Sequence, residues 1–285
     1  MKQGGLQRSI NSLKDYFSKR DDILMAFIFG SQVRGKTTLE SDFDIAVYFK
    51  PKSGRLEYED DVFYDQETEI WNDLEKLLRS KVDFVVLNRL PSVSAFPIIN
   101  KGIPIIIKDR KIYLDFLLRV SSLAIDFREF MRDFVAIKAR SHSLSIEDKD
   151  NLIKIVNFLE KELMDSEEYE KLDFRTYKSD AKKRRSVERW VENIVNASID
   201  IAKILLASKK QQLPDTYVDT VNLLSILEEF DEEISKKMAS FVKLRNLMAH
   251  EYLDLRFSQI QEFIKEAKKI YGYLIEYADN FIKKN

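Results

Sequence analysis

The chain has 285 residues, with 47 Lys and Arg against 48 Asp and Glu, and it contains no cysteine. This length allows two domains of ordinary size, and the near-zero net charge excludes a protein-wide field that attracts nucleic acid, although local basic patches can still do so. A chain without cysteine has no disulfides and no thiolate metal sites, which fits a reducing compartment. Its start lacks the apolar core of a signal peptide, and no apolar run has the length of a membrane span. We therefore expect a cytoplasmic protein with no membrane partner.

The first part of the chain mixes helical and strand patterns. Helices are expected over residues 6–19, 60–80 and 92–100, where apolar residues recur at helical spacing or the segment is short and apolar. Strands are expected over residues 22–29, 43–49, 81–87 and 103–107. Residues 50–59 are polar and contain Pro and Gly, so we expect a loop there. This order of elements fits a small α/β core.

No strand pattern follows residue 110. Helical patterns cover residues 111–140, 148–170, 180–208, 217–230, 233–252 and 256–282. Such a series predicts an all-α bundle. We therefore expect an α+β chain in three parts: an N-terminal α/β domain over 1–110, a helical connector over 111–147 and a helical bundle over 148–285.

The stretch from Ile28 to Val47 carries the first candidate site. A buried strand ends abruptly at Gly30-Ser31, and Asp42 and Asp44 follow in an alternating segment. Residues two apart on a strand point to the same face, so both carboxylates face one way. Two carboxylates held together are typical of a site that supplies a cation, while Gly and Ser suit the close approach of a phosphate. The pattern indicates a site for a metal-bound nucleoside triphosphate.

The spacing in this stretch resembles that of the minimal nucleotidyltransferases, a family of the polymerase-beta-like superfold. The matching residues are Gly30-Ser31, Arg34-Gly35, Ser41, Asp42 and Asp44. The resemblance covers residues 20–108 and implies a third carboxylate on a neighbouring strand, for which Asp83 is the candidate.

The roles that this resemblance implies are as follows. Asp42, Asp44 and Asp83 would bind Mg²⁺, and Asp83 would also help to activate the acceptor. Gly30 and Ser31 would hold the triphosphate of ATP, with Ser41 beside the first Asp. Arg34 would contact the triphosphate or form a structural salt bridge, and the sequence leaves both open.

The second candidate site is the stretch Lys243–Tyr252 in the helical half, which contains one of the two histidines of the chain. His250 is suited to proton transfer near neutral pH, and the Arg245 guanidinium suits a phosphate whose charge grows during attack. This pairing fits metal-independent RNA cleavage, in which the ribose 2′-hydroxyl attacks the adjacent phosphate.

The arrangement of Arg245, Asn246, His250 and Tyr252 resembles the HEPN family, helical ribonucleases that often act as toxins. The resemblance covers residues 148–282, and the helix expected over 180–208 is similar to the one that precedes this motif in the family. On one helix, Arg245 and His250 would diverge by about 140°. Convergence needs a long Arg reach, a bent helix end or a second chain.

Chemistry favours the second chain, because in-line cleavage needs a general acid and a general base and the motif offers one His. A two-fold dimer places two motifs at one cleft, and the resemblance implies the same homodimer through the bundle. We interpret His142 as a loop or hinge residue. The run Lys182-Lys183-Arg184-Arg185 would track an RNA backbone or simply be a solvated helix start.

In prokaryotic toxin–antitoxin pairs that resemble these halves, the nucleotidyltransferase transfers AMP to the motif tyrosine of the HEPN partner. We therefore expect a self-regulating protein in which AMP from Mg-ATP is attached to Tyr252 and silences the ribonuclease. One alternative is a small-molecule nucleotidyltransferase of the aminoglycoside-modifying kind, whose helical domain shapes the acceptor pocket. Another is a dimeric module that has lost catalysis and only binds RNA or nucleotides.

Overall fold

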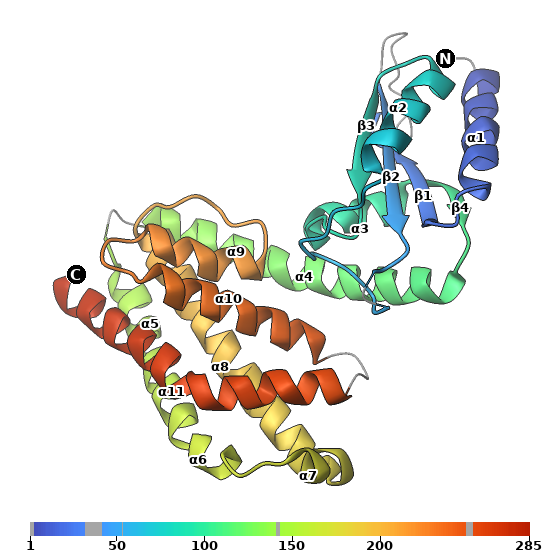
Figure 1. Ribbon diagram of the computed structural model, residues 1–285. Coiled ribbons are helices and arrows are strands. Elements are labelled where there is room, and N and C mark those ends of the chain that lie inside the picture. Colours follow the sequence, from blue (N-terminus) through green and yellow to red (C-terminus); the bar gives the residue numbers. More distant parts are fainter. Residues whose placement is uncertain (1–2, 32–41, 53, 141–142, 249–252) are drawn as a thin grey trace. The chain divides into compact units, whose positions relative to one another are not determined.

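The computed structural model describes residues 3–31, 42–52, 54–140, 143–248 and 253–285 (Figure 1). The chain divides into two compact units, Met1–Glu129 and Phe130–Asn285. A mixed α/β unit thus precedes an all-helical one, which confirms the predicted fold class and the order of the two parts.

The first unit is a four-stranded sheet with helices on both faces. Its elements are α1 (Gln3–Ser18), β1 (Ile23–Phe29), β2 (Phe43–Phe49), α2 (Glu67–Leu78), β3 (Val82–Val86), α3 (Ser92–Lys101), β4 (Ile103–Ile107) and the first part of α4 (Arg110–Arg140). The strand order is β3-β2-β1-β4. Strand β1 is antiparallel to both β2 and β4, whereas β2 and β3 run parallel.

Both faces of this sheet are buried, which explains the long apolar runs of β1 and β2. On one face, Ile45 and Val47 pack with residues of α1 and α2, including Phe17 and Leu74. On the other face, Ala46 and Tyr48 pack with residues of α3 and α4, including Phe116. Alternation along β2 therefore assigns its odd positions to the α1–α2 side and its even positions to the α3–α4 side.

The second unit is a helical bundle. It contains the remainder of α4, α5 (Ile146–Met164), α6 (Ser166–Tyr169), α7 (Phe174–Ser179), α8 (Ala181–Ser208), α9 (Tyr217–Asn222), the 3₁₀ helix η1 (Leu223–Ile226), α10 (Glu232–Leu247) and α11 (Leu253–Lys284). Helix α8 packs against α5, α7, α9, α10 and α11 (Figure 1). Aromatic rings on three of these helices meet in the core: Trp190 and Phe241 both lie edge-on to Phe263. No helix in the described ranges is long and apolar enough to cross a membrane.

The expected helix over 60–80 begins only at Glu67. The residues just before it are not helical, and they contribute to a buried polar cluster. Tyr64 stacks on Phe49 with ring centroids 4.2 Å apart, and its hydroxyl donates to the buried carboxylate of Glu57. Tertiary contacts therefore override helical propensity in this segment.

Three expected helices in the second unit also differ from the structure. The expected helix over 148–170 is divided into α5 and α6. The expected helix over 217–230 is divided into α9 and the short helix η1, which ends at Ile226. Phe230 packs edge-on against Tyr273 and Tyr277 of α11, which draws the segment after η1 out of helical conformation. Helix α10 ends at Leu247 rather than at 252. The three-part division of the chain at 110 and 147 stays a prediction; α4 begins at Arg110 and continues past Glu129, where the first compact unit ends.

A buried ion pair joins the first turn of α11 to α8. Arg256 Nη1 lies 2.8 Å from Glu188 Oε1, and the two side chains are only 8% and 20% exposed. The same carboxylate oxygen accepts a hydrogen bond of 2.6 Å from the Tyr177 hydroxyl of α7. Burial and this carboxylate raise the pKa of Tyr177, so its hydroxyl remains a neutral donor. One glutamate thus holds three helices together.

Replacing Glu188 with Ala leaves the buried Arg256 guanidinium without its carboxylate, so Glu188→Ala should lower the free energy of unfolding by about 3 kcal/mol. The matched control is Glu192→Ala on the same helix, whose pair with Arg189 is 38% and 70% exposed, and which should change stability by less than about 1 kcal/mol. Urea unfolding followed by Trp190 fluorescence in a Trp71→Phe background measures both. Equal losses would contradict the assigned role of the buried pair.

Candidate functional site

The first candidate site lies where β1 ends and β2 begins. Strand pairing places Phe29, the last residue of β1, opposite Asp44, and places Asp44 opposite Asp83 of β3. Residues paired across neighbouring strands point to the same face of a sheet. Asp44 and Asp83 therefore share the α3–α4 face, immediately beyond the core residue Ala46.

Gly30 makes a close approach to Asp44 possible. It follows β1 with a φ of 68°, in the left-handed region that favours glycine. A Cβ atom at this position would lie 2.0 Å from Asp44 Oδ2, closer than any real contact. The next residue, Ser31, donates its backbone N–H to the same oxygen at 3.3 Å. The turn is therefore shaped around the Asp44 carboxylate.

The other two carboxylates lie at the exposed rim of this edge. Asp42 directly precedes β2, and both it and Asp83 are exposed, whereas Asp44 is half-buried. Carboxylate oxygens are the ligands that Mg²⁺ prefers, so the chemistry of this donor set fits the expected metal. Among residues 3–31, 42–52, 54–140, 143–248 and 253–285, no three His, Cys, Asp or Glu side chains form a closed metal cluster. The trio shares an edge without being gathered around one point.

Several predicted site residues lie outside the described ranges. These are Arg34 and Ser41 in the first motif, and His250 and Tyr252 in the second. His142 also lies outside them.

In the second motif, the structure describes Arg245 and Asn246, both half-buried near the end of α10. The Arg245 guanidinium lies over the ring of Tyr217 of α9, 5.2 Å from its centroid. Its Nη1 atom is buried and has no hydrogen-bond partner in the described part of the chain. An aromatic ring face thus holds the cation while leaving hydrogen-bond donors for another group.

Sequence reasoning missed Tyr217 and the ring behind it. Phe130 of α4 lies edge-on to Tyr217 with centroids 5.4 Å apart, and Lys203 of α8 lies over the Phe130 ring at 5.3 Å. The motif arginine is therefore supported by side chains from α9, α4 and α8. Nothing in the sequence signalled this, because aromatic residues in a helical pattern are typical of ordinary core.

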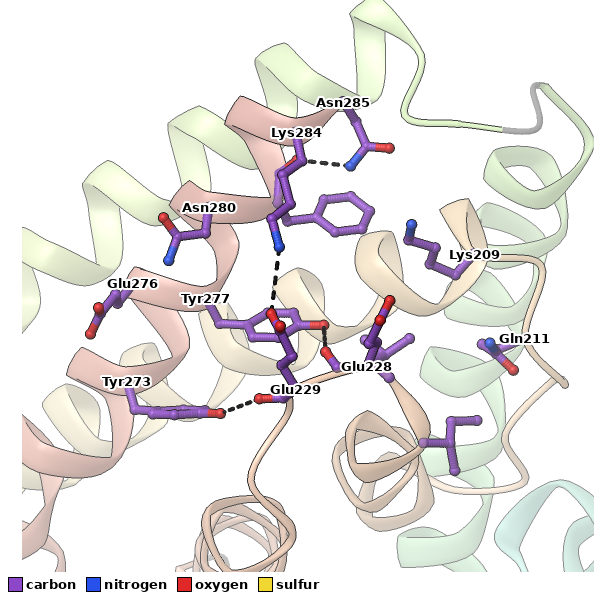
Figure 2. A pocket seen from close by; sticks show the side chains of 13 residues that line it. Lys209, Gln211, Glu228, Glu229, Tyr273, Glu276, Tyr277, Asn280, Lys284 and Asn285 are labelled. Carbon is purple, nitrogen blue, oxygen red and sulfur yellow. Dashed lines mark hydrogen bonds and ion pairs between the residues drawn. The ribbon is translucent and has the colours of Figure 1, made fainter.

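The bundle also contains an open pocket of about 850 Å³ at the far end of α11 (Figure 2). The Tyr273 and Tyr277 hydroxyls donate to the backbone oxygens of Glu229 and Glu228, and Lys284 pairs with Glu229. Tyr273 lies about 30 Å along α11 from Leu253, where the helix begins just after the motif. The pocket is thus separate from the Arg245 site.

Comparisons with known proteins agree with the two-part geometry. Residues 11–111 match the family model "Polymerase beta, Nucleotidyltransferase", and residues 159–276 match the model "Ribonuclease HepT-like". The comparison with curated proteins finds no match.

Similar solved structures include a toxin–antitoxin crystal structure with AMP-PNP. It is 17% identical with a TM-score of 0.35, and the match covers 48% of this chain and 97% of that one. Two mutants of the MntA-HpeT toxin–antitoxin are 18% and 21% identical, each with a TM-score of 0.35, covering 46% of this chain and 94% of theirs. From the two family matches, the chain carries a polymerase-beta-type nucleotidyltransferase domain followed by a HepT-like domain of the HEPN group.

Proposed function

We propose that this chain is a self-regulating protein of the toxin–antitoxin type. Its nucleotidyltransferase domain transfers AMP from Mg-ATP to Tyr252, and this modification silences a metal-independent ribonuclease in the HepT-like domain. The observation that carries the proposal is the union of both family matches on one chain, with Gly30, Asp44 and Asp83 aligned at one sheet edge. The proposal places this chemistry in the cytoplasm, where ATP is available.

In the transfer step, the Tyr252 hydroxyl attacks the α-phosphorus of ATP. A new P–O bond forms, the bond to pyrophosphate breaks, and the phenolic proton passes to Asp83. Gly30 lets the triphosphate approach the backbone, while Ser31 contributes an amide and a hydroxyl. Asp42, Asp44 and Asp83 would hold Mg²⁺. When bound, Mg²⁺ lowers the pKa of the acceptor and neutralises the departing pyrophosphate.

The cleavage step uses the second motif. The ribose 2′-hydroxyl attacks the adjacent phosphorus, the bond to the 5′-oxygen breaks, and a 2′,3′-cyclic phosphate remains. Arg245, held over Tyr217 with a buried Nη1 that has no partner among the described residues, neutralises the charge that grows on the phosphate. The His250 side chains of two chains in a homodimer serve as base and acid.

Modification of Tyr252 blocks this cleft by charge and by bulk. The attached AMP adds a negative phosphodiester and an adenosine two residues from His250, and this charge repels the RNA phosphate that Arg245 attracts. Tyr252→Phe keeps the ring and removes only the nucleophile. It should therefore take up no label from [α-³²P]ATP while RNA cleavage persists, and it should be more toxic in cells than wild type.

Two controls accompany that prediction. Asp44→Ala should also abolish label transfer, because it removes the central carboxylate of the edge. Tyr252→Phe combined with His250→Ala should be harmless in cells. Normal label uptake by Tyr252→Phe, or by Asp44→Ala, would overturn the proposal.

A second prediction concerns the turn at Gly30. Gly30→Ala forces the Asp44 carboxylate to move, and a displacement of about 1 Å in such a site lowers the transfer rate by about a hundredfold. Gly54→Ala is the matched control: its φ of 70° gives a comparable backbone strain, but its Cβ meets nothing within 4 Å. Gly54→Ala should transfer at the wild-type rate. Transfer that is equally fast in both variants would contradict the role of the turn.

A third prediction tests the composite cleft. Chains carrying Arg245→Ala and chains carrying His250→Ala should each be inactive on RNA alone, whereas their mixture should recover part of the cleavage. In the mixed dimer one intact Arg245 and one intact His250 meet across the interface, and water replaces the second His250 in proton transfer, so the recovered rate should stay well below wild type. Cleavage by a monomer shown as such by ultracentrifugation, or cleavage abolished by EDTA, contradicts the dimeric metal-free mechanism.

A further inference from the structure

The segment that covers α7 and the start of α8 is strongly basic in an otherwise neutral chain. Between residues 173 and 185 there are six basic and two acidic residues, whereas the whole chain has a net charge of −1. Five of the basic side chains are exposed, and they form what we call the α7–α8 surface: Arg175, Lys178, Lys182, Lys183 and Arg185. Figure 1 shows α7 beside the first turns of α8.

The structure separates these five from the sixth basic residue. Arg184 is half-buried, and its Nη1 donates to the backbone oxygens of Tyr177 and Lys178, so it holds the end of α7. None of the five exposed side chains takes part in an ion pair with a described residue. The two acids in the segment, Asp173 and Asp180, are occupied as N-caps of α7 and α8. Lys178 lies over the ring of Phe174, and Asp180 attracts Lys182 and Lys183, but the surface keeps a net positive charge that a partner can meet.

Helix stability does not explain charges of this sign at this place. The N-terminus of a helix carries a partial positive charge, which favours acidic residues in the first turn and disfavours basic ones. Helices α2, α5 and α10 each have two acidic residues in the first turn, whereas α8 has none and, like α4, begins with basic residues. Cations at the start of α8 repel both the helix dipole and each other, and an anionic partner would relieve this repulsion.

Side-chain contacts connect the α7–α8 surface to the start of α11, which follows the second motif. Tyr177 of α7 and Arg256 of α11 meet at Glu188 of α8. Arg256 lies three residues after Leu253, where α11 begins directly beyond the second motif. The start of α11, which follows the second motif in the chain, is therefore held against α7 and α8.

We propose that the α7–α8 surface binds the phosphate backbone of single-stranded RNA and guides it to the Arg245 motif. This proposal rests on the ribonuclease function proposed above. Lys and Arg on two adjacent elements suit a chain of phosphates, which they attract without reading its sequence. An acidic protein segment is the competing partner.

The test measures RNA binding separately from cleavage, in chains that carry His250→Ala. Fluorescence anisotropy follows a labelled single-stranded oligoribonucleotide between about 50 and 200 mM salt. Replacing Lys182, Lys183 and Arg185 with Gln should weaken binding by ten- to a hundredfold at about 100 mM salt. The slope of log K against log salt should become shallower by about 2, because each lost phosphate contact contributes about 0.7.

The matched control removes three exposed lysines of the first unit, Lys14, Lys76 and Lys111, by the same change to Gln. It should leave the slope unchanged. An unchanged slope in the Lys182/Lys183/Arg185 variant, or equal changes in both triple variants, would overturn the proposal. The proposal would also be overturned if the Lys182/Lys183/Arg185 variant lost binding to an acidic peptide while its RNA binding stayed intact.

Cleavage by the wild-type active site gives the second readout. In chains with His250 intact, the Lys182/Lys183/Arg185 variant should have a higher KM for long RNA, an unchanged kcat and unchanged cleavage of a dinucleotide, which is too short to reach the surface. If the unmodified chain binds RNA through the surface but cleaves none, the ribonuclease proposal fails and the binding surface stands. If the chain cleaves RNA with a KM that the Lys182/Lys183/Arg185 substitutions do not change, the binding-surface proposal fails and the ribonuclease proposal stands.

Discussion

The pairing of three strands fixes the geometry of the candidate site in the first unit. Antiparallel β1 and β2 set the end of one strand beside the beginning of the next, and parallel β3 adds Asp83 to the same line. A register shift of one residue would turn Asp44 to the opposite face, toward α1 and α2. Gly30 then determines how closely the backbone turn approaches that carboxylate. Without this register Asp44 and Asp83 would not lie side by side on one face of the sheet.

In the second unit, a buried arginine and a stacked arginine fix the positions of helices near the second motif. Arg256 is fixed by Glu188, and Arg245 is fixed by the ring of Tyr217. Both contacts bring α8 or α9 to the segments that flank the second motif. A buried arginine restricts the geometry around it, because its guanidinium is stable only where its partners are already in place. The packing of the bundle therefore determines where these two guanidinium groups lie.

Sequence periodicity was sufficient for the strands and the long helices, because β1, β2 and β4 are apolar runs with clear ends and α8 has a continuous buried stripe. It failed where side chains far apart in sequence decide the backbone, as at Tyr64 and Phe230. The helical patterns leave residues 171–179 unassigned, although α7 forms there behind Asp173, an N-cap that accepts from the Thr176 amide. The support of Arg245 by Tyr217 depends on the packing of separate helices, which local spacing does not encode. Arg34, Ser41, His250 and Tyr252 stay predictions from their motifs.

The central claim is that one half of this chain modifies the other. The most direct measurement is intact-mass analysis of the purified chain after incubation with Mg-ATP, followed by peptide mapping of the modified residue. The account predicts the gain of one AMP, located on the peptide that contains Tyr252. AMP on another residue would contradict it, and so would an unmodified chain that adenylylates an aminoglycoside in the same solution.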